Sequence, residues 1–178
     1  MAATPAPKRN RSVFLSPTGI AGAEADEDLS IAKAEELHMR GIPDEFFGCP
    51  LVYVIIVKID GTEYLKIGKA HRFFSTKRKD TKKTNRQRYF SIIRDLRFKC
   101  QCKAKIVKIL CFIKEYVGED GELTINDIES DLLSKTTEHK IIPKEGLKEY
   151  RDLEKKEEIM EIINSYIRSH ELTAHKNP

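Results

Sequence analysis

The chain has 178 residues and a formal net charge of +4, with 40% hydrophobic and 34% charged residues. These figures indicate one compact globular domain with short extensions. They exclude a membrane-spanning helix, because no stretch approaches ~18 consecutive apolar residues. Since the N-terminus also lacks the apolar core of a signal peptide, we expect an intracellular protein (cytoplasmic, nuclear or virus-associated) that does not bind a membrane.

The N-terminal part is predicted to lie outside the main domain. Residues 1–28 are expected to be a flexible tail, because prolines and glycines interrupt them and an acidic cluster closes them. Residues 29–48 are expected to be a helical extension. Apolar residues at helical spacing predict a helix over residues 29–40, and Gly41 and Pro43 end it.

Three strands are predicted in the following domain, residues 49–178. Residues 51–59 are rich in Val, Ile and Tyr, and they are apolar enough to be buried on both faces of a sheet. The dipeptide Asp60-Gly61 favours a hairpin turn, after which residues 62–68 return as the second strand. Residues 104–113 form the third predicted strand.

Helices are predicted between and after these strands. Basic residues 75–83 and the periodic segment 86–98 precede the third strand. Thr124 is a typical N-cap for an apolar helical stripe, and a long final helix covers about residues 154–169. The order of elements predicts an α+β (mixed α/β) fold, in which helices flank a small three-stranded central sheet.

The basic residues are concentrated in one segment. Sixteen Lys or Arg residues and only two acidic residues lie between Lys66 and Lys108, so this segment carries about +14 and the rest of the chain about −10. Such asymmetry is typical of a polyanion-binding surface, although an ordinary solvated face is the alternative. The candidate nucleic-acid contacts are Lys69, Arg72, Lys77, Lys79, Lys82, Lys83, Arg86, Arg88 and Tyr89.

Two short motifs occupy the predicted hairpin. The run LVYVI at residues 51–55 contains Tyr53, and the run LKIGKA at residues 65–70 contains Lys66 and a glycine two residues later. Thirteen positions separate Tyr53 from Lys66. A basic segment follows, and Glu129 lies on the helix after the third strand.

In this order, the motifs resemble the GIY-YIG nuclease superfamily, over roughly residues 50–168. The segment from Gly146 to the final helix is also similar to the end of phage- and virus-type members. The first motif keeps only its tyrosine, and Lys66 stands where the family usually has tyrosine. The resemblance implies catalytic roles for Tyr53, Lys66, Arg78 and Glu129, with Arg72 as the rival to Arg78.

The implied activity is metal-dependent hydrolysis of phosphodiester bonds in DNA, as in restriction-type, viral or mobile-element endonucleases. Glu129 would hold one Mg²⁺ (or Mn²⁺), which needs only one or two carboxylates. Tyr53 or Lys66 would be the general base, and Arg78 would clamp the phosphate. The family places a hydroxyl or imidazole one turn after the arginine, where this chain has Lys82; Tyr89 is the alternative.

Several alternatives stay open at this stage. Glu129 has acidic neighbours that could replace it, among them Asp127, Asp131 and Glu138. The chain could bind nucleic acid without cutting it, or it could be a protein-interaction module that docks through its acidic C-terminal helix. Duplex DNA is the expected partner, RNA is not excluded, and a symmetric double-strand cut would require a homodimer or paired monomers.

Overall fold

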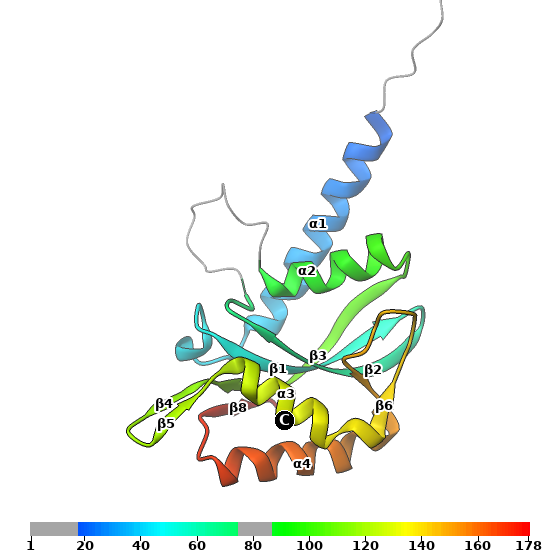
Figure 1. Cartoon of the computed structure of the whole chain (residues 1–178). Helices are drawn as coiled ribbons and strands as arrows, with labels where there is room; N and C mark the ends of the chain where they lie inside the picture. Colours follow the sequence, from blue (N-terminus) through cyan, green and yellow to red (C-terminus); the bar gives the residue numbers. More distant parts are fainter. Residues whose placement is uncertain (1–17, 75–86) are drawn as a thin grey trace, which may run out of the picture.

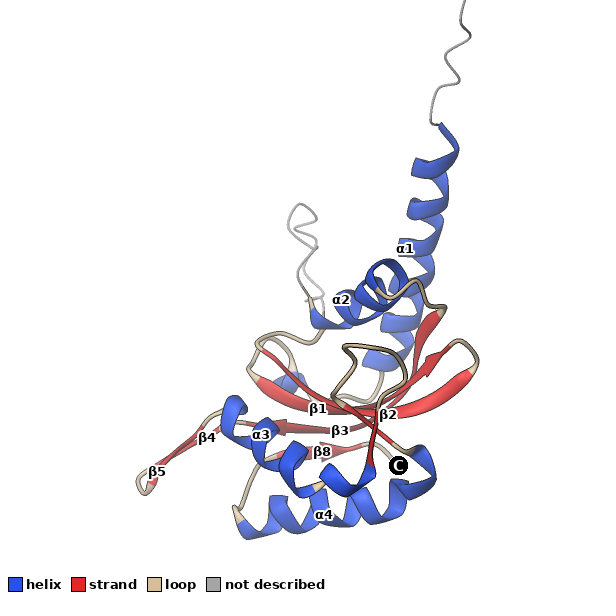
Figure 2. Cartoon of the chain, turned by 45° about the vertical axis from the view of Figure 1, so that its right-hand side comes forward, coloured by secondary structure: helices blue, strands red, loops and turns tan. Residues whose placement is uncertain are grey.

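The computed structural model describes residues 18–74 and 87–178, and these form an α+β fold. The helices are α1 (Thr18–Met39), α2 (Arg88–Arg94), α3 (Ile125–Lys135) and α4 (Lys156–Ser169). The strands are β1 (Leu51–Ile59), β2 (Thr62–Ala70), β3 (Ala104–Lys114), β4 (Tyr116–Gly118), β5 (Gly121–Leu123), β6 (Lys140–Ile141), β7 (Tyr150–Arg151) and β8 (Ala174–Lys176). Helices α1 and α2 cover one face of the main sheet, and α3 and α4 cover the other (Figures 1 and 2).

The main sheet has six strands in the described ranges, in the order β6-β7-β2-β1-β3-β8, and every pair is antiparallel. The α+β class is therefore confirmed, but a sheet of three strands is wrong. The three predicted strands form its long centre, and short strands extend it at both edges. Edge strands of two or three residues are too short to show the alternating pattern that identifies a strand in a sequence.

Strand β1 separates two apolar layers, as its uninterrupted apolar run predicted. Its odd-numbered residues, such as Tyr53 and Ile55, pack with α1 and α2. Its even-numbered residues, such as Val52 and Val54, pack with α3 and α4. The turn to β2 places Asp60 at φ 48° and Gly61 at φ 95°, which is the left-handed backbone that a two-residue hairpin requires.

Helix α1 corrects the prediction for the N-terminal part. It begins at Thr18, within the segment 1–28 that was expected to be a tail; residues 1–17 lie outside the described ranges. Acidic residues in the middle of this helix form ion pairs with the body of the protein, Asp28 with Arg94 at 2.6 Å and Glu27 with Arg97 at 2.8 Å. These pairs hold residues that their glycines and charges made unlikely helix formers.

The segment 29–48 shares the main core, because Ile31, Ile42 and Phe46 pack in the same apolar cluster as β1. It is thus joined to the domain by a common core. No helix in the described part of the chain has the length and apolar character needed to cross a membrane.

The remaining predicted helices are confirmed with adjusted bounds, except the one over residues 75–83, which lies outside the described ranges. Helix α2 continues as a π-helical turn, Asp95–Lys99. Helix α3 begins with a capping box, in which Thr124 and Asp127 bond each other's backbone N–H groups. This cap fixes the start of the helix that carries Glu129.

Candidate active site

Tyr53 lies in the middle of the sheet face that α1 and α2 cover. It is fully buried, and its ring packs against Phe73 with 4.9 Å between ring centroids. Its partner in the β1–β2 register is Gly68, so the side of the ring next to β2 meets a residue without a side chain. A Cβ at Gly68 would lie 2.5 Å from Tyr53 Cζ. The glycine of the second motif therefore makes the space that the tyrosine occupies.

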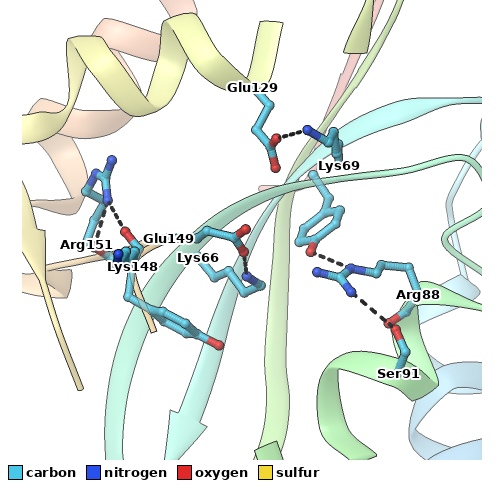
Figure 3. A network of polar contacts seen from close by, with 10 residues as sticks. Lys66, Lys69, Arg88, Ser91, Glu129, Lys148, Glu149 and Arg151 are labelled. Carbon is cyan, nitrogen blue, oxygen red and sulfur yellow. Dashed lines mark hydrogen bonds and ion pairs between the residues drawn. The ribbon is translucent and has the colours of Figure 1, made fainter. Parts of the chain in front are cut away.

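Arg88, the first residue of α2, contacts the Tyr53 hydroxyl directly. Its Nε donates a hydrogen bond to the hydroxyl oxygen at 3.0 Å, and its Nη1 lies 3.5 Å from Ser91 Oγ (Figure 3). Backbone bonds fix the position of the helix start, because the N–H of Arg88 bonds the carbonyl of Arg72 at 3.2 Å. The arginine is thus held to the end of β2 by main-chain geometry.

Lys66 is the buried cation of the site. Only 5% of its side chain is exposed, yet it forms an ion pair with Glu149, whose side chain is 40% exposed. Its Nζ also lies 4.9 Å from the centre of the Tyr150 ring. Strand β7 brings both partners, because Tyr150 is paired with Lys66 and the carbonyl of Glu149 accepts the N–H of Ile67.

The surroundings shift the pKa values of Lys66 and Tyr53 in opposite directions. Burial lowers the pKa of Lys66, and the charge of Glu149 opposes that change. Burial raises the pKa of Tyr53, while Arg88 acts in the opposite direction. Tyr53 is therefore a neutral phenol whose hydroxyl can donate a hydrogen bond, and Lys66 is the group of the two that loses its proton more readily than in water.

Glu129 reaches the site from α3, on the other face of the sheet. Its side chain is 10% exposed and forms an ion pair with Lys69 at 2.6 Å (Figure 3). On the edge of β2, strand β7 pairs with Leu65 and Lys66, and the carbonyl of Glu149 just before β7 accepts the N–H of Ile67.

A cavity of about 310 Å³ adjoins this cluster. Lys66, Arg88, Glu149 and Tyr150 line it together with the loop before β7. It is open to solvent and large enough for a small ligand or one nucleotide unit. The site thus combines an accessible hollow with buried, charged and hydrogen-bonded side chains.

The donor set suits one hydrated divalent cation. Glu129 supplies one carboxylate, and Mg²⁺ is commonly bound by one or two carboxylates and several waters. Lys69 now pairs with that carboxylate, and its 41% exposed side chain can turn to solvent when a cation replaces it. Within residues 18–74 and 87–178, no group of three or more His, Cys, Asp or Glu side chains is arranged to hold a metal.

Of the four residues with predicted catalytic roles, Tyr53 and Lys66 share one face of the sheet, and Glu129 lies on the other face, where it pairs with Lys69 (Figure 3). The fourth, Arg78, lies outside the described residues. So do the predicted nucleic-acid contacts Lys77, Lys79, Lys82, Lys83 and Arg86.

The described nucleic-acid candidates have different positions. Arg72 is exposed next to the site, Lys69 is paired with Glu129, and Arg88 contacts Tyr53. Tyr89 does not fit its predicted role, because it is fully buried and its hydroxyl is 2.7 Å from His38 Nδ1. Its helical spacing with the apolar residues of α2 is the signal that identifies it as a core residue.

Two further residues were missed in the sequence. Glu149 was not singled out, because its partner Lys66 is 83 positions away. Arg151 is 2% exposed and bonds Thr136 Oγ1 and the Leu133 carbonyl at 2.8 Å each, at the C-terminal end of α3. A guanidinium at that position satisfies carbonyls that the helix leaves free and joins α3 to β7. No local pattern in a single sequence reports such a contact.

Comparisons of the chain with protein-family models, with curated proteins and with solved structures found no match.

Proposed function

We propose that the chain is a metal-dependent endonuclease that hydrolyses phosphodiester bonds in DNA. The observation that carries this proposal is the contact between Arg88 and the Tyr53 hydroxyl, at 3.0 Å, beside the buried cation Lys66. Arg88 and the buried Lys66 line an open hollow, and Arg88 also bonds the buried Tyr53. These groups suit a negatively charged substrate whose reaction needs proton transfer and charge stabilisation.

Arg88 is suited to hold the scissile phosphate. Its Nε bonds Tyr53 and its Nη1 approaches Ser91, while no described residue bonds its Nη2. A guanidinium presents a planar fork of donors, which matches two oxygens of one phosphate. In this proposal Arg88 takes the role for which the family resemblance suggested Arg78, and Arg78 becomes a further phosphate contact.

Lys66 is the better candidate for the general base, and Tyr53 for a donor that orients the substrate or the attacking water. A base must be unprotonated before it accepts a proton, and burial favours the unprotonated, neutral form of Lys66. Burial disfavours the phenolate that Tyr53 would need for the same role. Glu149 would stabilise the positive charge that develops on Lys66 when Lys66 takes the proton of water.

Glu129 would hold the Mg²⁺ or Mn²⁺ ion, after Lys69 has released its carboxylate. A bound divalent cation supplies Lewis-acid stabilisation of the charge that develops on the phosphate oxygens. Lys69 would then be free to contact the DNA backbone. The exchange of partners at Glu129 would thus free the glutamate to hold the cation and Lys69 to contact the DNA.

Nicking of supercoiled plasmid with Mg²⁺ or Mn²⁺ tests the proposal. Glu129→Gln keeps the shape of the side chain but removes its charge, and we expect at least a hundredfold loss of nicking with DNA binding retained. Glu157→Gln is the matched control, because Glu157 is 91% exposed on α4 and should leave nicking unchanged. Full activity of Glu129→Gln would contradict the assignment.

A second candidate function is nucleic-acid binding without cleavage. It is favoured by one observation, that Lys66 and Glu129 are both occupied by ion pairs with Glu149 and Lys69. In that case the plasmid would stay supercoiled with either metal, while a labelled duplex would still bind with strong dependence on salt.

A further inference from the structure

A second hollow lies at the other end of β1, beside the β1–β2 turn. Its volume is about 800 Å³, and its walls come from the turn at Asp60 and Gly61, the end of the π-helical turn and the start of β3. Tyr53 lies six residues before Ile59 on β1, so this hollow is roughly 20 Å from the candidate active site. Its size is in the range that holds one nucleotide.

Phe98 is the aromatic residue of this hollow, and it is 58% exposed. It belongs to the π-helical turn Asp95–Lys99. Two residues after that turn, Gln101 has a left-handed backbone, with φ 51°. π-Helical turns are rare, and a left-handed backbone is costly for residues other than glycine. Where they do occur, both are concentrated at functional sites. Here the unusual backbone presents a large apolar ring to solvent.

Positive charge surrounds the ring. Lys103 and Lys105 line the hollow, both are exposed, and no ion pair within the described ranges engages them. The two acidic residues of the lining are already neutralised, since Glu27 pairs with Arg97 at 2.8 Å and Asp60 with Lys144 at 3.1 Å. The free charge that the hollow presents to a ligand is therefore positive.

We propose that this hollow is a second nucleic-acid contact, which takes an unpaired nucleotide with its base stacked on Phe98 and its phosphates against Lys103 and Lys105. An aromatic ring flanked by cations is the arrangement that binds single strands, because stacking uses the face of any base and the cations follow the backbone. In a duplex those faces are already stacked on each other. An apolar protein segment would not need the two free lysines.

The inference rests on the proposed function, and it narrows the substrate class. A nuclease with a single-strand contact about 20 Å from its active site favours DNA with an unpaired segment next to the cut, such as a flap or a branch. The duplex would cross the cluster of Arg88 and Lys66, and the unpaired strand would reach Phe98.

The full chain contains no tryptophan, so Phe98→Trp places a single fluorescent reporter in the hollow. We expect an oligothymidylate to quench it to saturation, and a hairpin without unpaired bases to quench it weakly. Val117→Trp is the matched control, because Val117 is 74% exposed on the acidic β4–β5 hairpin and should show no change. Single-stranded RNA in parallel separates a DNA contact from an RNA contact.

Two variants test the roles of the ring and the lysines. Phe98→Ala should weaken binding of the single strand by roughly fivefold to a hundredfold, while nicking of fully paired plasmid stays within about twofold. Lys103→Ala with Lys105→Ala, in the Phe98→Trp protein, should reduce the slope of log affinity against log salt by about 1.4, since each phosphate contact contributes about 0.7.

The outcomes separate this inference from the endonuclease proposal. Quenching without cleavage of either plasmid or a flap duplex supports the hollow and contradicts the nuclease. An unquenched Phe98→Trp protein that nicks plasmid and binds a labelled oligothymidylate overturns the hollow and leaves the nuclease intact. A quench that does not depend on salt or on the two lysines overturns the inference, because it would indicate an apolar contact in place of a nucleotide.

Discussion

Gly68 lies directly opposite Tyr53 in the β1–β2 register, and a Cβ at Gly68 would come within 2.5 Å of Tyr53 Cζ and closer still to the hydroxyl oxygen. The backbone of Gly68 does not have a positive φ, so space alone determines the need for glycine here. The tyrosine ring, packed by Phe73 at 4.9 Å, has little room to move away. The glycine of the second motif therefore supports the tyrosine of the first.

Gly68→Ala should disable the site without unfolding the protein. The added methyl group displaces the Tyr53 hydroxyl from Arg88, and a displacement of about 1 Å at a reacting group commonly costs about a hundredfold in rate. We expect plasmid nicking to fall by that factor, measured under the conditions that give wild-type activity. Strain in the packed core should also lower the free energy of unfolding by about 1–3 kcal/mol.

Gly22→Ala is the control for this change. Apart from its chain neighbours and the backbone of its own helix α1, no atom of the described residues lies within 4 Å of a Cβ at Gly22. Alanine should stabilise the helix slightly and leave nicking unchanged. Equal nicking rates for the two variants would contradict the steric role of Gly68.

Tyr53→Phe and Tyr89→Phe should separate catalysis from stability. Both tyrosines are fully buried, and among the described residues the Tyr53 hydroxyl bonds Arg88 and the Tyr89 hydroxyl bonds His38. Loss of either bond should cost about 1 kcal/mol of unfolding free energy in urea denaturation. Only Tyr53→Phe should reduce nicking, by a hundredfold or more. If both variants keep full activity, the Tyr53 hydroxyl has no catalytic role.

The centre of the fold could be predicted because its patterns are local. Val, Ile and Tyr in succession identify β1, the Asp60-Gly61 pair identifies its turn, and Thr124 identifies the start of α3. Each depends on neighbours within a few residues. Of the edge strands, β7 and β8 pair with the long strands β2 and β3, and β6 pairs with β7, so their few residues depend on distant partners and carry no pattern of their own.

The candidate site could be predicted in part for the same reason. Tyr53, Lys66 and Glu129 follow from motifs on single elements, whereas their partners arrive from distant segments. Arg88 is 35 positions from Tyr53, and Glu149 is 83 positions from Lys66. Arg88 lies in a run of many cations, and its position beside Tyr53 depends on the bond from its backbone N–H to the carbonyl of Arg72, which no local sequence pattern indicates.

The Lys66–Glu149 pair should respond unequally to loss of its two members. Glu149→Gln leaves a buried cation without a counter-ion, because the Lys66 side chain is only 5% exposed. Lys66→Met leaves a carboxylate that is 40% exposed and that water can solvate. We expect a loss of about 2–3 kcal/mol for Glu149→Gln and about 1 kcal/mol or less for Lys66→Met, measured by urea denaturation.

The double variant distinguishes pairing from packing. With Lys66→Met present, Glu149→Gln should cost almost nothing further, because the buried charge that it would expose is gone. Additive losses in the double variant would show that the two side chains contribute independently, against the ion pair as their main interaction.

Protein stability should fall below pH 6.5 through His38. Its Nδ1 lies 2.7 Å from the Tyr89 hydroxyl and its Nε2 3.2 Å from the Val107 carbonyl, so the neutral ring accepts from the tyrosine and donates to the carbonyl. Burial lowers the pKa of His38 from 6.5, and the bond to Val107 opposes that shift. The unfolded chain therefore binds a proton at a higher pH than the folded protein does, and unfolding becomes easier as the pH falls from 6.5 to the folded pKa.

His38→Gln tests this dependence, because a glutamine amide can also donate to Val107 and accept from Tyr89 but does not titrate. Its unfolding free energy should change less than that of the wild type between pH 7 and pH 5, by urea denaturation at each pH. His71→Gln, at an exposed position, should keep the wild-type slope. His38 lies on α1 and Tyr89 on α2, so the loss of stability at low pH should appear first as release of α1. If the unfolding free energy of all three proteins changes equally with pH, groups other than His38 cause the acid sensitivity.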